Sequence, residues 1–202
     1  MSSVVPRRPG RPLGGQLVVD RDHVLDAAER VIKRDGPGAS LESMAVEAGV
    51  TKPIVYDRVG GRAELADALA ERLSDRMLEA TENAIAGEPL NQASLSRLVR
   101  ANLQTVAEHR ELFLYVTGGT TEQTAIGRLS LAERSTTPLA KTLAVWRKSQ
   151  GLDPMVADAW SFGIVGMLQM ISVWWITQPE RSATEVAEQI SDLMWNGLRG
   201  PH

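Results

Sequence analysis

The sequence predicts an all-α fold of about nine helices, and three observations carry this prediction. Every strong apolar periodicity in the 202 residues has a helical spacing. No segment shows the apolar-polar alternation typical of a strand. Glycine- and proline-containing breaks separate the periodic segments. We expect a flexible basic arm at residues 1–20, a three-helix unit at 21–66 and a larger helical bundle at 67–202.

Composition limits the classes of protein to which the chain can belong. The absence of cysteine excludes disulfides, thiolate metal sites and cysteine nucleophiles. No signal-like segment begins the chain, so we expect a cytoplasmic protein. The net charge of −3 neither supports nor excludes a nucleic-acid partner, so any basic surface must be local.

The basic arm is such a local feature. Residues 1–20 carry Arg7, Arg8 and Arg11 against Asp20 alone, and their proline and glycine content argues against a packed element. The run Arg8-Pro9-Gly10-Arg11-Pro12 resembles the Gly-Arg-Pro core of AT-hook segments, whose arginine can enter a narrow minor groove. A plain disordered tail remains the alternative.

The first three predicted helices form a helix-turn-helix unit. An apolar stripe runs through residues 21–35 and ends at Gly36-Pro37-Gly38. Ser40 suits the N-cap of a second helix, and Gly49 suits a turn that needs a positive φ. Thr51 can cap the third helix, and Pro53 fits its first turn. Thr51, Lys52, Pro53 and Tyr56 are then available to an outside partner.

The remaining periodic segments predict six more helices. A long helix begins near Arg62 and lasts to about residue 86, and shorter ones cover residues 95–106 and 110–116. A seventh helix spans residues 122–150, where Pro138 must kink or split it. The eighth covers about residues 155–177 and the ninth about residues 183–198.

The last two helices predict a subunit interface. Residues 159–178 contain no charged side chain and approach the length of a membrane span. Polar and glycine residues dilute this segment and no Lys/Arg cluster flanks it, so we expect burial between core and partner and no membrane contact. The pair suits a homodimer in which each subunit contributes two helices to a four-helix bundle. The expected interface residues are Trp175, Val186, Ile190, Leu193 and Met194.

Residues 21–70 resemble the N-terminal domain of TetR-type transcriptional repressors. The resemblance is carried by Ser40-Leu41, Ala48-Gly49-Val50-Thr51-Lys52, Tyr56, Val59, Arg62 and Glu64-Leu65, together with a preceding helix and a long following one. It implies an all-helical homodimer with two DNA-reading heads, a C-terminal small-molecule pocket and lower DNA affinity when the ligand binds.

The resemblance also implies roles for single residues on a palindromic double-stranded operator. Lys52 and Pro53 lie where bases are touched, and Thr51 and Tyr56 where phosphates are held. Ile54, where a small polar residue is frequent in the family, would contact a thymine methyl group if it faces the groove. The remaining phosphate candidates are Ser40, Arg58 and Arg62, with Arg7, Arg8 and Arg11 in the arm.

The effector implied by the resemblance should be mostly hydrophobic, because most of the aromatic residues lie in the C-terminal part. They could line an apolar cavity that carries a few polar groups. The candidate ligand-binding residues are Asn102, Phe113, Thr117, Trp146, Trp160, Met167, Gln169, Met170 and Trp174.

The chain offers little for catalysis. Its histidines, His23, His109 and His202, stand in no metal-ligand spacing, and no nucleophile or phosphate-loop motif occurs. We therefore expect no enzyme, no metal and no cofactor. A helical DNA-binding activator or adaptor that lacks a ligand switch remains the alternative to a ligand-responsive repressor.

Overall fold

A computed structural model of the chain describes residues 20–118 and 122–198, with side chains left out for residues 122–131 and 198. This part of the chain is all-helical and contains no strand. The N-terminal helices are α1 (Arg21–Asp35), α2 (Leu41–Glu47) and α3 (Lys52–Val59). The body consists of α4 (Arg62–Ile85), α5 (Gln92–Glu108), α6 (Arg110–Thr117), α7 (Glu122–Ser149), the 3-10 turn η1 (Pro154–Val156), α8 (Ala157–Trp175) and α9 (Ala183–Leu198).

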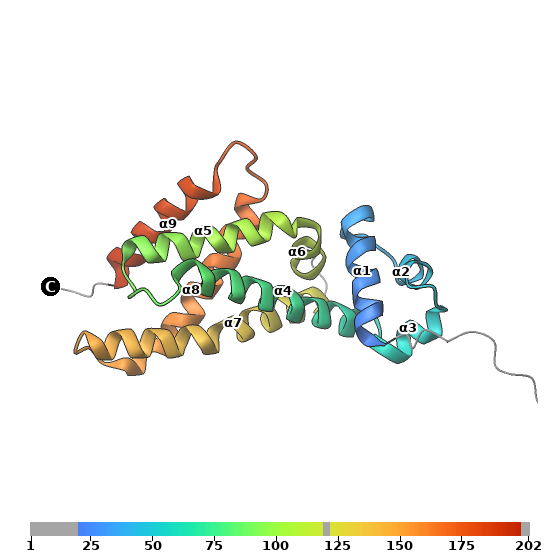
Figure 1. The fold of residues 1–202 in the computed structure, drawn as a ribbon, viewed down its shortest axis with the longest axis horizontal. Helices are drawn as coiled ribbons and strands as arrows, with labels where there is room; N and C mark the ends of the chain where they lie inside the picture. The colour runs from blue at the N-terminus through green and yellow to red at the C-terminus, as the bar shows by residue number, and fades with distance from the viewer. Residues whose placement is uncertain (1–19, 119–121, 199–202) are drawn as a thin grey trace, which may run out of the picture.

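Helices α1 to α3 gather at one end of an elongated molecule, and α4 leads from them into the body (Figure 1). In the body, α4 packs on α5 and α7, α5 packs on α9, and α7 packs on α8. Helix α6 lies beside α1, where the two parts meet (Figure 1). The all-helical prediction and the order of its helices are confirmed.

One expected break is absent. Helix α7 continues through Pro138 as a single helix, so the alternative of two separate helices is wrong. Proline removes one backbone donor, but the flanking turns are held by packing on α4 and α8. The eighth helix is shorter than predicted, because residues 154–156 form a 3-10 turn before α8 begins.

Two clusters of buried side chains form the core. The first joins α1, α2 and α3 to the start of α4 and continues into α6 through Leu112, Phe113, Tyr115 and Val116. The second joins α5, α7, α8 and α9. Apolar packing is therefore continuous across residue 66, and the domain boundary placed there stays a prediction.

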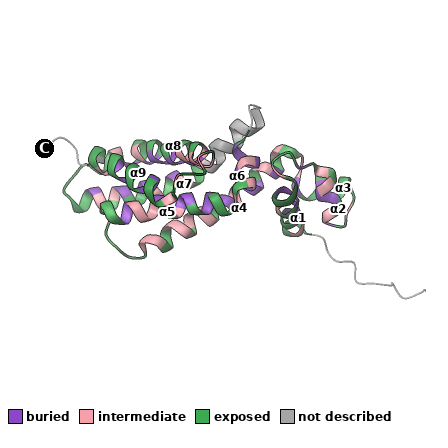
Figure 2. Ribbon diagram, turned by 90° about the horizontal axis from the view of Figure 1, so that it is seen from above, coloured by how far each residue is buried: buried purple, intermediate pink, exposed green. Residues whose placement is uncertain are grey.

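Helix α8 is partly exposed. Within the described helices, Pro154–Trp175 is the one segment long and apolar enough to cross a membrane, and 33% of its most apolar window is buried inside the protomer. Figure 2 shows exposed residues along α8 and α9. A helix of this kind needs either a partner or an apolar solvent for its exposed face.

Candidate nucleic-acid interface

The turn between α2 and α3 has the geometry that a helix-turn-helix requires. The Ser40 hydroxyl accepts a hydrogen bond from the Ser43 N–H at 3.1 Å and so caps α2. Gly49 has a φ of 67°, a left-handed conformation that side chains disfavour. The next residue, Val50, donates its N–H to the Ala45 carbonyl at 3.0 Å. The chain therefore turns from α2 into α3 at a fixed angle.

Side chains behind the turn fix α2 and α3 on α1. Val55 and Val59 of α3 are buried in the first core cluster. The His23 ring nitrogen Nε2 lies 3.1 Å from the Ala48 carbonyl oxygen at the end of α2. Arg30 of α1 also forms an ion pair with Glu47 of α2 at 2.8 Å. These contacts leave the opposite side of α3 open to solvent.

That open side carries most of the predicted DNA-binding residues. Thr51 occupies the N-cap position of α3, but its side chain makes no capping hydrogen bond. Ile54 is 38% exposed and Tyr56 49% exposed, so both project from the protein. Arg58 pairs with the neighbouring Asp57 at 3.1 Å. The exposed set on and beside α3 comprises Ser40, Thr51, Lys52, Pro53, Ile54, Tyr56 and Arg58.

Arg62, a predicted phosphate contact, also makes contacts within the protein. Its guanidinium donates to the Ala39 carbonyl at 3.3 Å and lies over the Tyr115 ring of α6. This residue therefore contacts the body of the protein and the loop before α2. The contact could not be read from the sequence, because Tyr115 is distant along the chain. Arg7, Arg8 and Arg11 lie outside the described residues.

The body holds two adjoining small cavities between α4, α5, α7 and α8. One has a volume of about 120 Å³ and the other about 50 Å³, and both are lined by Met77, Asn102, Val165 and Leu168. Asn102 is the buried polar group here, and it accepts a hydrogen bond from the Ser172 hydroxyl at 3.3 Å. The lining is otherwise mainly apolar, so the space suits an apolar group.

The predicted ligand-binding residues separate into distinct places. Asn102, Phe113 and Gln169 line the smaller cavity. Thr117 is buried, and its hydroxyl donates to the Phe113 carbonyl. The remaining candidates lie elsewhere: Trp146 against Trp195, Trp160 against Arg147, and Met167, Met170 and Trp174 on the exposed surface. The sequence missed Met77, Val165 and Leu168, which look like ordinary core positions.

The predicted dimer residues are also divided. Val186 and Met194 are buried inside the protomer, because the apolar stripe of α9 packs on α5. Ile190 and Trp175 pack partly against the same core, and Trp175 donates its ring N–H to the Arg181 carbonyl at 2.9 Å. Leu193 is 60% exposed. It borders an open groove between α8 and α9 that is also lined by Trp160, Gly163, Met167 and Gly197.

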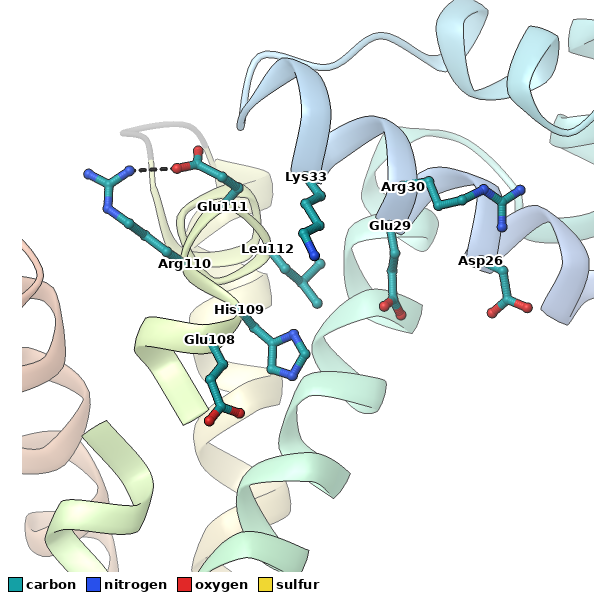
Figure 3. A pocket seen from close by; sticks show the side chains of 9 residues that line it. All are labelled: Asp26, Glu29, Arg30, Lys33, Glu108, His109, Arg110, Glu111 and Leu112. Carbon is teal, nitrogen blue, oxygen red and sulfur yellow. Dashed lines mark hydrogen bonds and ion pairs between the residues drawn. The ribbon is translucent and has the colours of Figure 1, made fainter. Parts of the chain in front are cut away.

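A polar cleft of about 520 Å³ separates α1 from the corner between α5 and α6. Figure 3 shows Glu29 and Lys33 reaching from α1 toward the side on which His109 lies. Burial and the nearby charge of Arg76 lower the pKa of His109, so its ring is neutral at neutral pH. Among the residues the structure describes, no three His, Asp or Glu side chains cluster as metal ligands would.

Comparisons with known proteins agree with this architecture. No protein-family model matches the chain. An HTH-type transcriptional regulator of Mycobacterium tuberculosis, itself uncharacterised, is 25% identical over 185 residues, which cover 89% of this chain and 77% of that protein. A TetR-like regulator of Rhodococcus sp. RHA1 is also 25% identical, with a TM-score of 0.59 over 90% of this chain and 97% of that one.

Two further solved structures share the fold at lower identity. The fatty acid degradation regulator FadR from Bacillus halodurans has a TM-score of 0.68 at 20% identity over 89% of this chain and 96% of that chain. The TetR family repressor AlkX from a Dietzia strain has a TM-score of 0.63 at 20% identity over 88% of this chain and 96% of that chain. The chain therefore shares the fold of TetR-family transcriptional regulators and is similar to them over most of its length.

Proposed function

We propose that the chain is a dimeric cytoplasmic repressor that binds a palindromic DNA operator and is released by a mostly hydrophobic small molecule. The observation that carries the DNA-binding part is the exposed face of α3, whose opposite face is anchored by Val55 and Val59. A short helix that is fixed from behind and open in front can enter a major groove.

The proposed roles follow from position on that face. Lys52 and Pro53, at the exposed start of α3, contact base edges. Ile54, with 38% of its surface exposed, contacts a thymine methyl group. Thr51 and Tyr56 hold phosphates through their hydroxyls, as does Ser40 at the start of α2. Arg58 adds positive charge, although Asp57 partly offsets it.

The effector is proposed to bind where the two small cavities adjoin. Their mainly apolar lining supports an apolar ligand, with the Asn102 amide as a polar anchor. At about 120 Å³ and about 50 Å³, the cavities must widen to hold a ligand of ordinary size. A flexible alkyl chain is the ligand class proposed. Similar folds in a fatty acid degradation regulator and in a repressor implicated in n-alkane biodegradation support this class.

The dimer is proposed to form through the exposed faces of α8 and α9. Phe162 and Met170 are 58% and 67% exposed, which is unusual for large apolar side chains on one surface. A Cβ added at Gly163, Gly166 or Gly197 would meet nothing within 4 Å, so these glycines have no packing role inside the protomer. Their absence of side chains would allow the backbone of a second copy to approach closely.

Binding to the DNA upstream of the protein's own gene tests the proposal, with dodecanoate as the probe of the effector site. We expect specific binding that dodecanoate weakens. The variant Val165→Phe fills the larger cavity, and should bind DNA normally while losing the dodecanoate response. Specific binding with no dodecanoate effect on the wild type would contradict the alkyl-chain effector, and no specific binding would contradict the repressor itself.

A further inference from the structure

Arg62 joins the first turn of α4 to the loop that leads into α2. Its Nη1 donates to the Ala39 carbonyl at 3.3 Å, and its Nη2 makes a longer contact of 3.5 Å to the Pro37 carbonyl. Ala39 directly precedes Ser40, the residue that caps α2. The guanidinium therefore holds the chain immediately before the helix-turn-helix.

The same guanidinium lies over an aromatic ring of the body. Its central carbon is 5.2 Å from the centroid of the Tyr115 ring, within the range of a cation–π contact. Tyr115 belongs to α6 and is 6% exposed, so its ring has a fixed position. Its hydroxyl is buried without a hydrogen-bond partner in the described part of the chain, so the ring face makes the polar contact of this side chain.

Helix α6 also faces the cavity. Phe113 lines the smaller cavity and is fully buried. Residues two apart on a helix point about 200° from each other around its axis. Phe113 therefore faces the cavity while Tyr115 faces Arg62, and a shift of α6 that begins at Phe113 must also displace the Tyr115 ring.

We propose that Arg62 is a positioning residue, through which Tyr115 of α6 sets the position of the α2 N-terminus in the helix-turn-helix unit formed by α1 to α3. The inference rests on the proposed function and states how the helical body of the protein is coupled to the helix-turn-helix unit. It replaces the phosphate contact expected for Arg62, because its donors point to the Pro37 and Ala39 carbonyls. A ligand that displaces Phe113 changes DNA affinity through this contact.

The salt dependence of DNA binding separates the two roles of Arg62. If Arg62 is a positioning residue, Arg62→Met weakens DNA binding about tenfold and leaves the slope of log K against log salt concentration unchanged. If Arg62 instead contacts a phosphate, Arg62→Met reduces the magnitude of that slope by about 0.9 for each DNA-bound subunit. Arg62→Lys, which keeps the charge but loses the planar fork, should resemble Arg62→Met. A reduced slope for Arg62→Met, or wild-type affinity for Arg62→Lys, overturns the proposal.

Substitutions at Tyr115, which lies in α6 outside the helix-turn-helix unit, provide a second test. Tyr115→Phe keeps the ring and removes only an unpaired hydroxyl, so it should bind DNA as the wild type does. Tyr115→Leu removes the ring face and should weaken binding about as much as Arg62→Met. The double variant should be no weaker than either single variant, because both remove one contact. Additive effects, or normal affinity for Tyr115→Leu, contradict the coupling.

Hydrogen exchange measured on the free protein tests the coupling through Arg62 independently of the repressor proposal. Arg62→Met should speed exchange in α2 (Leu41–Glu47) and leave α9 (Ala183–Leu198) unchanged. Arg62 is an exposed residue at the start of α4, so its replacement leaves the core intact. Unchanged exchange in α2 overturns the coupling even if the protein binds its operator. Faster exchange in a protein that binds no specific DNA would instead contradict the repressor proposal alone.

Discussion

Arg72 of α4 donates a 2.6 Å hydrogen bond to the carboxylate of Asp26 on α1, across 46 residues of sequence. The same guanidinium reaches Asp22 at 2.8 Å and Glu29 at 3.3 Å. Arg76, one turn further along α4, pairs with Glu29 at 2.7 Å. Three acidic side chains of α1 are thus tied to one face of α4, which fixes the helix-turn-helix unit on the body.

Replacement of Arg72 by methionine should lower the free energy of unfolding by about 1–2 kcal/mol. The Arg72 side chain is only 21% exposed, but Asp22 and Asp26 are 78% and 58% exposed, so water screens part of the interaction. Urea unfolding measures the loss. Arg34→Met is the comparison variant: the Arg34 side chain is 56% exposed, so water should screen its ion pairs with Asp35 and with Glu47 of α2 more strongly and its loss should matter less. Equal losses in the two variants would contradict a special role for Arg72.

Ser40 and Thr51 occupy equivalent N-cap positions with different contacts. Ser40→Ala removes the 3.1 Å cap of α2 and should cost about 1 kcal/mol of stability. Thr51 makes no capping hydrogen bond, so Thr51→Ala should leave the unfolding free energy nearly unchanged while weakening DNA binding. Thermal unfolding and DNA affinity are measured on both variants. A stability loss at Thr51 as large as that at Ser40 would show that Thr51 serves the fold.

The helices were predictable from the sequence because their signals are local. The stripe through Val24, Leu25 and Ala28, the Ser40 cap and the Gly49 turn all act within a few residues of each other. The exposed face of α3 follows from the same spacing. The partners of Arg62 and Arg72 were not predictable. An arginine gives the same signal in the sequence whether its guanidinium contacts a phosphate, a carbonyl or a distant carboxylate.

The faces of α8 and α9 show the same limit. The apolar stripe of α9 predicted a buried face, but the sequence could not tell the protomer core from a partner subunit. Val186 and Met194 lie in that core, whereas Met170 and Trp174, expected at a ligand, lie on the surface. Which of two apolar faces is covered by the chain itself depends on how the helices cross.

The exposed face of α8 gives a test of the dimer. Phe162→Glu together with Met170→Glu places two charges on the proposed interface and should convert a dimer into a monomer. Light scattering after size-exclusion chromatography measures the molar mass. Val145→Glu is the matched control, since Val145 is a 71% exposed apolar residue on α7, outside the groove. A double variant that stays dimeric places the interface elsewhere.

The lowered pKa of His109 predicts that the folded protein loses stability in mild acid. Its pKa is lowered by burial and by Arg76, and is raised less by Glu29 and Glu108, while Lys33 adds to the lowering. The unfolded chain therefore binds a proton that the folded chain excludes, so stability is lost as the pH falls below about 6.5. His109→Gln should reduce the difference between melting temperatures at about pH 7.5 and about pH 5.5. An unchanged difference would show that other groups govern this pH range.

The central claim is that the face of α3 reads DNA, and a salt titration of binding tests it most directly. The wild-type protein should prefer the DNA upstream of its own gene over random duplex by about 1000-fold or more. Its log K should fall steeply with log salt, by about 0.9 for each phosphate neutralised. Lys52→Ala should reduce that preference. A shallow salt slope with no preference over random duplex would contradict the account.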